Sequence, residues 1–346
     1  MQTLKSFFMK KLSVFKASAI LILSSAMVMS LVTSCEGPEG VAGVDANETC
    51  KQCHNGESVL IAKINQAANS QHQLGITSFE NASSCAPCHT SQGFIEALAN
   101  DTTATVAAIS NPVAINCRTC HDIHKEYDST DFALRSEAPV KLRLIAETLD
   151  LGGPSNLCAN CHQPRSVAVY PVAGGANISV TSSRLPGHYG TQSTMLAGMA
   201  GYEVAGSADY PSAANPHKAA GCVTCHMAEP VGSLTGGHTF RMENEEEGPN
   251  LAGCVACHPS AKDFDIDGTQ TDIAALLADL NAALVADGIL KASGSVNASS
   301  TAPLSLSPDK YGALLNFAMV KNDGSMGVHN PAYAKALLSN SIEVFN

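Results

Sequence analysis

The sequence predicts a mostly α-helical fold with extensive loops, in which apolar side chains alone do not fill the core. The chain has 346 residues, no tryptophan and only 5% aromatic residues, whereas glycine and proline are frequent. A short cysteine motif recurs six times between residues 50 and 258, and two stretches beyond it have helical apolar patterns. A chain of this length is long enough for one large domain or two modest ones. The scarcity of large aromatic side chains therefore indicates that another group supplies part of the core.

Twelve of the thirteen cysteines form six C-x-x-C pairs, and a histidine directly follows each pair. The composition alone predicts about 0.02 such motifs, so the repetition is not accidental. The motifs are CKQCH at 50–54, CAPCH at 85–89, CRTCH at 117–121, CANCH at 158–162, CVTCH at 222–226 and CVACH at 254–258. Because the motifs mostly start 32 to 41 residues apart, with one longer step of 64, we expect neighbouring sites to lie close together.

The spacing is that of covalent c-type haem attachment, in which two thiols form thioethers and the next histidine binds the iron. Zinc knuckles do not require a histidine directly after each pair, and a thioredoxin-like motif would occur once. We therefore expect six haem c groups that form the core. The attachment cysteines are Cys50, Cys53, Cys85, Cys88, Cys117, Cys120, Cys158, Cys161, Cys222, Cys225, Cys254 and Cys257, and the proximal iron ligands are His54, His89, His121, His162, His226 and His258.

The other six histidines match the number of distal ligand positions that six haems would need. These are His72, His124, His188, His217, His238 and His329, and the alternative for each is an ordinary structural histidine. His124 lies three residues after His121, whose own iron it cannot reach, so we expect it to bind a neighbouring haem. If one histidine fails, a methionine could replace it, and the candidates are Met195, Met199, Met227, Met242 and Met326.

These residues resemble multihaem c-type cytochromes of the bacterial envelope. The resemblance covers most of the chain after residue 49 and includes the arrangement around His217 and Met227, the HTF at His238 and the terminal GVHNPAYAKALL. It implies a distant similarity to pentahaem nitrite reductases and octahaem oxidoreductases. Those reductases have an attachment motif with lysine in place of the proximal histidine. No C-x-x-C-K occurs in this sequence, so the resemblance assigns no catalytic residue.

The N-terminal residues predict export and lipid attachment. Residues 1–34 combine a lysine-rich start with an apolar run over 17–32, which is typical of a signal peptide rather than a spanning helix. The run ends in VTSC, which resembles a bacterial lipobox, so we expect lipidation of Cys35. Residues 35–49 read as a flexible tether. The prediction is an exported lipoprotein of the cell envelope, in the outer membrane and on either of its faces.

Residues 50–346 form one predicted hexahaem domain, whose last part, 259–346, has no attachment motif. There we expect one helix with Ile273, Leu276, Leu277, Leu280 and Leu284 on one face and a stop at Gly288. A second helix should start at Asn330 and Pro331, directly after His329. We also expect mostly loop over 163–216, with a short strand at 166–172, and a solvated acidic loop or docking patch at 241–248.

Charge and composition narrow the function. Removing the four lysines of residues 1–34 takes the formal charge from −11 to −15, which disfavours nucleic acid as a partner. The favoured function is an envelope-anchored electron carrier between protein donors and acceptors. The alternatives are an oxidoreductase for a small nitrogen or sulfur compound, acting at one haem with an open iron position, and a subunit of a haem filament.

Overall fold

The computed structural model describes residues 50–51, 53–56, 58–75 and 77–346. The chain divides into two units, Met1–Gln52 and Cys53–Asn346. The predicted signal peptide, the tether and the lipidation site Cys35 lie outside the described residues. In the ranges given above, no helix is both long and apolar enough to span a bilayer.

The second unit is mostly helical with long connecting loops, as the sequence predicts. The helices before residue 230 are short: α3 (Ser58–Ala68), α4 (Gln71–Leu74), α5 (Ala86–His89), α6 (Ser91–Ala99), α7 (Cys117–Cys120), α8 (Ser155–Ala159), α9 (Gln192–Ala197) and α10 (Pro216–His226). Single 3₁₀ turns occur at Ser129–Phe132, Gly237–Thr239 and Ile266–Gly268. Four of these helices, α5, α7, α8 and α10, contain cysteines of attachment motifs.

The strands are short and form three separate antiparallel pairs within the described residues. β1 (Val140–Lys141) pairs with β2 (Thr148–Leu149), and β4 (Glu243–Asn244) pairs with β5 (Gly248–Pro249). β3 (Ile178–Val180) pairs with the distant β6 (Leu304–Leu306), with Ile178 opposite Leu306. These pairs fasten loops together and do not build a layer of their own.

Two glycines allow the short helices to approach closely. A Cβ at Gly93 of α6 would lie 2.4 Å from the Ala86 backbone of α5, so only glycine lets these helices pack as they do. Gly221 breaks the regular helical angles inside α10 with φ 71°, and a Cβ there would lie 2.5 Å from Ser155 Oγ. The same hydroxyl accepts a hydrogen bond from Cys222 N at 3.0 Å, which fixes α10 against α8.

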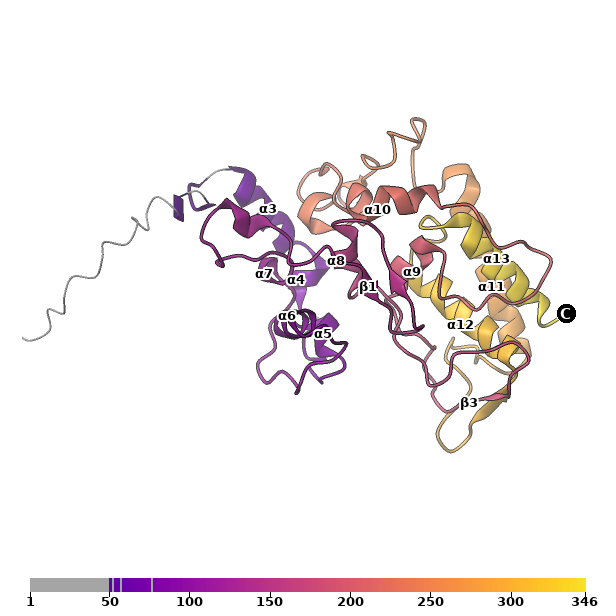
Figure 1. Cartoon of the computed structure of the whole chain (residues 1–346). Helices are drawn as coiled ribbons and strands as arrows, with labels where there is room; N and C mark the ends of the chain where they lie inside the picture. The colour runs from indigo at the N-terminus through magenta and orange to yellow at the C-terminus, as the bar shows by residue number, and fades with distance from the viewer. Residues whose placement is uncertain (1–49, 52, 57, 76) are drawn as a thin grey trace, which may run out of the picture. The chain divides into compact units, whose positions relative to one another are not determined.

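A conventional side-chain core lies in the C-terminal part, where α11 (Thr269–Ala286), α12 (Pro308–Asp323) and α13 (Pro331–Glu343) pack together (Figure 1). The apolar stripe of α11 is buried as predicted at Ile273, Leu277, Leu280 and Leu284, while Leu276 is half-buried. α12 is buried on nearly every side, because α9, α11 and α13 all contact it. Each fully buried leucine contributes about 1.5–3 kcal/mol. This part of the fold therefore does not depend on haems for its core.

Two local expectations differ from the structure. Residues 166–172 form no strand, because Pro171 cannot donate a backbone hydrogen bond and Tyr170 instead donates its hydroxyl proton to Gly201 O at 3.0 Å. The strand of this region is β3, whose partner is β6. The acidic run 241–248 is not simply a solvated loop, since β4 and β5 close it into a hairpin. Glu247 there accepts hydrogen bonds from Ser233 N and Leu234 N, both at 2.8 Å.

Candidate haem-binding sites

Each of the six histidines that end a C-x-x-C-H motif faces one of the other six histidines. The ring centroids are 6.0 to 6.4 Å apart in all six pairs. We number the sites by the chain order of the motif histidine. The pairs are His54–His124 (site 1), His89–His188 (site 2), His121–His238 (site 3), His162–His72 (site 4), His226–His329 (site 5) and His258–His217 (site 6).

The separation fits two imidazoles on opposite sides of one metal ion. Two metal–nitrogen bonds of about 2 Å each, plus the radii of the two rings, give a centroid separation of about 6 Å. The angle between the ring planes, in contrast, varies from 31° to 76°. Two imidazoles that hold one metal ion from opposite sides would be free to rotate about the line that joins them, and this rotation does not change the centroid separation. A nearly constant centroid separation with a variable angle between the ring planes is therefore expected if both imidazoles bind one metal ion. Direct packing of two rings would not by itself keep the separation constant in all six pairs.

The motif histidines are presented by single helical turns. His89 N donates to Cys85 O at 3.2 Å and His121 N donates to Cys117 O at 2.9 Å, with the same pattern at His162 and His258. Residues three and four apart share one face of such a turn, so both thiols and the imidazole point to one side. The asparagine Asn116 caps the turn at Cys117 through a capping box. Among the described residues, none of the twelve motif cysteines forms a disulfide, which is compatible with covalent haem attachment.

The opposite histidines are held by several different local structures. His72 lies in α4, His217 in the first turn of α10 and His238 in a 3₁₀ turn that follows Gly236. His124 and His188 have positive φ angles of 64° and 61°, which a residue with a side chain seldom adopts unless its surroundings impose it.

A buried carboxylate imposes that conformation on His124. Asp131 Oδ2 accepts hydrogen bonds from His124 N at 2.7 Å and from Tyr127 N at 3.1 Å. Its Oδ1 accepts from Glu126 N at 2.8 Å and from Lys125 N at 3.2 Å. These backbone hydrogen bonds, the one from Glu126 first, hold the pKa of Asp131 below its usual value. Asp131 was not predicted from the sequence, because no local pattern marks an aspartate seven residues after the predicted ligand His124.

Hydrogen bonds at Nδ1 leave the other ring nitrogen of several histidines free to bind a metal. His121 Nδ1 contacts Phe132 O at 2.7 Å, His226 Nδ1 contacts Phe240 O at 3.0 Å and His217 Nδ1 contacts Val328 O at 2.5 Å. A carbonyl accepts a proton from Nδ1, which places the lone pair on Nε2. His162 makes a longer contact of the same kind to Gln192 Oε1 at 3.3 Å, and His329 contacts Asp323 Oδ1 at 2.6 Å.

Burial lowers the pKa of six of the twelve rings, those of His72, His89, His162, His188, His226 and His238. It lowers the pKa of His72 to about 4, with a contribution from His162, and it lowers the pKa of His238 to about 4 with Lys63 and His121 adding to the effect. A neutral imidazole is the form that binds a metal. His329 differs: burial lowers its pKa, but the hydrogen bond and charge of Asp323 outweigh burial and raise it.

Contacts between the sites give their order in space. Sites 1 and 3 are joined through His124 and His121, which are three residues apart. Sites 3 and 4 share the Phe240 ring, which lies 5.9 Å from the ring of His238 and 5.1 Å from that of His72. Phe240 has a φ of 58°, and its carbonyl also contacts His226 of site 5. One strained residue therefore touches three sites.

Cysteines join sites 2, 4 and 5. Cys161 Sγ of site 4 donates to Pro87 O in the motif of site 2 at 3.6 Å, and Cys88 Sγ of site 2 lies 4.0 Å from Asn160 O in the motif of site 4. Helix α8, which carries Cys158 of site 4, is joined to site 5 by the hydrogen bond from Cys222 N to Ser155 Oγ at 3.0 Å. Site 4 therefore contacts sites 2, 3 and 5.

Helix α10 joins sites 5 and 6, because it carries both His226 and His217. Gly253, directly before the site 6 motif, approaches the same helix so closely that a Cβ would lie 2.9 Å from Cys225 Cα. The contacts thus follow the order 1–3–4–5–6, and site 2 branches from site 4.

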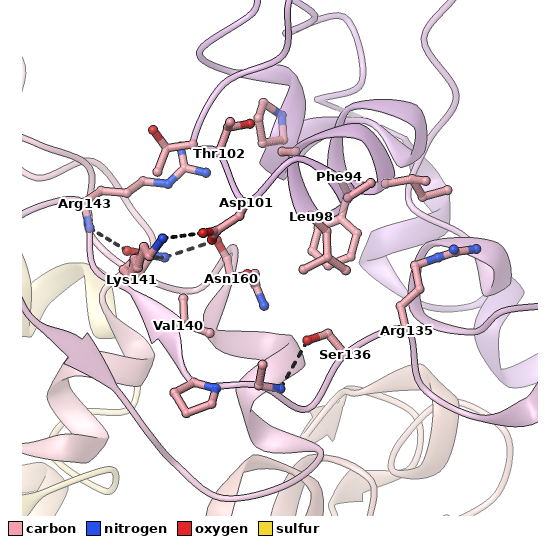
Figure 2. Close-up of a pocket in the computed structure, with 18 of the residues that line it drawn as sticks. Phe94, Leu98, Asp101, Thr102, Arg135, Ser136, Val140, Lys141, Arg143 and Asn160 are labelled. Carbon is pink, nitrogen blue, oxygen red and sulfur yellow. Dashed lines mark hydrogen bonds and ion pairs between the residues drawn. The ribbon is translucent and has the colours of Figure 1, made fainter.

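A cavity of about 440 Å³ is lined by Pro87 of the site 2 motif and Asn160 of the site 4 motif, among other residues (Figure 2). Lys141 in its wall is ion-paired with Asp101, and Arg135 is paired with Asp122 at 2.7 Å. Arg143 Nε, in contrast, is buried without a partner, as is Arg241 Nε next to Phe240. Unsatisfied cationic donors next to the sites fit a group with anionic carboxylates, which haem has in its propionates.

The five methionines named as substitute ligands are not needed, because each motif histidine already faces a histidine. Met195 is buried in the C-terminal core, and Met199 packs in a smaller cluster with Leu196. Both therefore serve as packing residues.

No protein-family model matches the sequence, and no curated protein matches it significantly. Among solved structures, the chain is similar to the outer cell wall cytochrome OcwA, with a TM-score of 0.52 and 21% identity over 82% of this chain and 50% of OcwA. It is also similar to an undecaheme cytochrome from the S-layer of Carboxydothermus ferrireducens, with a TM-score of 0.47 and 21% identity over 80% of this chain and 40% of that one. The chain spans half or less of the length of each neighbour. The similarity to nitrite reductases expected from the sequence stays a prediction. The chain has the mostly helical, loop-rich fold of a multihaem cytochrome.

Proposed function

We propose that the protein is an electron carrier of the bacterial cell envelope that binds six haem c groups. The supporting observation is the set of six imidazole pairs, each of which contains one C-x-x-C-H histidine and has a centroid separation of 6.0 to 6.4 Å. In each site the two motif cysteines would attach the porphyrin and the two histidines would bind its iron. Bound haem supplies one-electron exchange at its iron.

The residues of the protein favour a carrier over an enzyme. Two histidines at one iron leave no coordination position for a substrate, and every site has both. Burial lowers the pKa of six of the twelve rings, which favours the neutral form that binds a metal. The Nδ1 hydrogen bonds of His121, His217 and His226 leave Nε2 available to bind it. The contacts among sites 1, 3, 4, 5 and 6 supply a continuous series of neighbours, with site 2 as a side branch. Redox proteins that serve as donor and acceptor are the partners this arrangement needs.

Two measurements on the purified protein test the proposal. Its intact mass should exceed the polypeptide mass by six haems, and a stable count of five or fewer would contradict the site assignment. The reduced protein should show only low-spin spectra and bind little carbon monoxide. A high-spin haem that binds nitrite or hydroxylamine in the unmodified protein would instead support the oxidoreductase.

The proposed envelope location rests on the lipobox-like VTSC, and it is supported by the similarity of the fold to OcwA, which is described as an outer cell wall cytochrome. We propose that a lipid on Cys35 anchors the protein in the outer membrane. A Cys35→Ala variant should then leave the membrane fraction while keeping its haems. If the variant still fractionates with membranes, the anchor lies elsewhere.

A further inference from the structure

Site 5 differs from the other sites in the partner of its distal histidine. Among the described residues, His329 is the one histidine of the six pairs whose ring nitrogen contacts a carboxylate, with His329 Nδ1 2.6 Å from Asp323 Oδ1. The other histidines with an Nδ1 contact are His121, His217 and His226, which contact backbone carbonyls, and His162, which contacts the side-chain amide of Gln192. A carboxylate is a stronger acceptor than either, because it carries a full negative charge.

The carboxylate is held firmly in place. Asp323 is the last residue of α12, and its side chain is only 1% exposed. Ser325 donates its hydroxyl proton to Asp323 Oδ2, and the same Oγ accepts a hydrogen bond from His329 N at 3.2 Å. Gly324, with a φ of 72°, makes the turn that brings these residues together. Aspartate, serine and histidine therefore form one small network at the end of the helix.

A buried carboxylate at Nδ1 increases the electron density on Nε2. It draws the Nδ1 proton toward itself, so the imidazole becomes a stronger donor to a metal bound on its other side. A stronger anionic donor stabilises the oxidised, more highly charged iron relative to the reduced iron. The low dielectric around a nearly fully buried side chain enlarges this effect.

We propose that Asp323 is a positioning residue that gives site 5 the most negative reduction potential of the six. This inference rests on the proposed function, because it requires that haem binds at the six pairs. Site 5 lies between sites 4 and 6 in the order of contacts, so the most negative potential would lie inside the series rather than at its end.

The test is a redox titration of the complete haem-loaded protein, followed by absorbance and by electron paramagnetic resonance. Asp323→Asn keeps the size of the side chain but removes its charge, so the most negative of the six components should move to a more positive potential. The other five should stay where they are. The low-spin signal of the same component should shift toward that of a neutral bis-histidine haem.

A second variant has the opposite sign. Ser325→Ala removes the proton donor to Asp323 Oδ2 and leaves more negative charge facing His329, so the same component should become more negative. Asp272→Asn is the matched control, since Asp272 is exposed and paired only with Lys335 at 3.2 Å. It should leave all six components unchanged.

The outcomes separate this inference from the proposed function. If six low-spin components titrate and neither Asp323→Asn nor Ser325→Ala moves one of them, the role of Asp323 is refuted while the carrier function stands. If Asp323→Asn moves a component other than the most negative one, the ranking of site 5 is wrong. If the unmodified protein has no low-spin components with two histidine ligands, the proposed function itself fails.

Discussion

Replacing Asp131 by asparagine should release His124 from its place opposite His54. The carboxylate accepts the backbone N–H groups of residues 124 to 127 at 2.7 to 3.2 Å with its two oxygens. Asparagine offers one oxygen, and its NH₂ group would face two of these N–H donors. His124 and Tyr127 both have positive φ angles, so the loop should relax to ordinary backbone angles once the acceptor is lost.

The size of the effect follows from the number of sites. One of the six irons should lose its distal ligand, so about one sixth of the haem should become high-spin and bind carbon monoxide. His124→Ala defines the full effect for the same site, and all six covalent attachments should remain in both variants. Asp128→Asn is the control, because asparagine can still accept the hydrogen bond from Thr130 N at 2.8 Å and so keep the cap of the 3₁₀ turn that carries Asp131.

The absorption spectra and the carbon monoxide binding of Asp131→Asn, His124→Ala and Asp128→Asn test whether Asp131 positions His124. If His124→Ala opens a site and Asp131→Asn does not, then Asp131 does not position the ligand and the loop holds itself. If His124→Ala also leaves the spectrum unchanged, His124 is not a ligand and the pair His54–His124 has another cause.

Three further predictions concern stability and local packing. Leu280→Ala should lower the free energy of unfolding by about 2–5 kcal/mol, because Leu280 is fully buried, whereas Val106→Ala at a 93% exposed position should change little in the same chemical denaturation experiment. The hydrogen bond from the Thr271 hydroxyl, and to a smaller extent those from backbone N–H groups, hold the pKa of Asp265 below its usual value. The carboxylate of Asp265 therefore binds a proton more readily in the unfolded chain than in the folded one. The stabilisation by ionised Asp265 should therefore be complete above the usual aspartate pKa and be lost as the pH falls through the lower folded-state pKa. The melting temperature of Asp265→Asn should then fall less steeply in acid than that of the unmodified protein. Equal acid dependence of the two melting temperatures would contradict this. Gly93→Ala should reduce the yield of folded protein, because its Cβ would meet the Ala86 backbone at 2.4 Å, and full recovery of folded protein would show that α5 and α6 can separate without cost.

Much of the fold was predictable where a local pattern decides it. The apolar spacing of residues 273–284 predicts helix α11, and Asn330 followed by Pro331 predicts the start of helix α13. The structure has both helices. The strand expected at 166–172 was wrong, because strand formation depends on a partner. The partner of β3 is β6, more than 120 residues away in the chain, and no local pattern indicates that pairing.

The size of the C-terminal side-chain core was also not predictable from composition. Few aromatic residues suggested that haems fill the core throughout. The structure concentrates leucines of α11, α12 and α13 in one place, so this part is well packed without any added group. An average over 346 residues does not show how apolar residues are distributed in space.

The sequence by itself predicted the chemistry that we propose for this protein. Six C-x-x-C-H motifs and twelve histidines name the residues that can hold six haems, because covalent attachment and proximal ligation use residues adjacent in the chain. Only the tertiary structure decided which histidine faces which. Partners such as His226 and His329 are brought together by packing between distant segments. The same holds for Asp131, Phe240 and Asp323, whose roles come from contacts across turns and between sites. The physical reason is that bonding within a motif is local, whereas the opposite ligand and its hydrogen bonds depend on how the whole chain folds around the site.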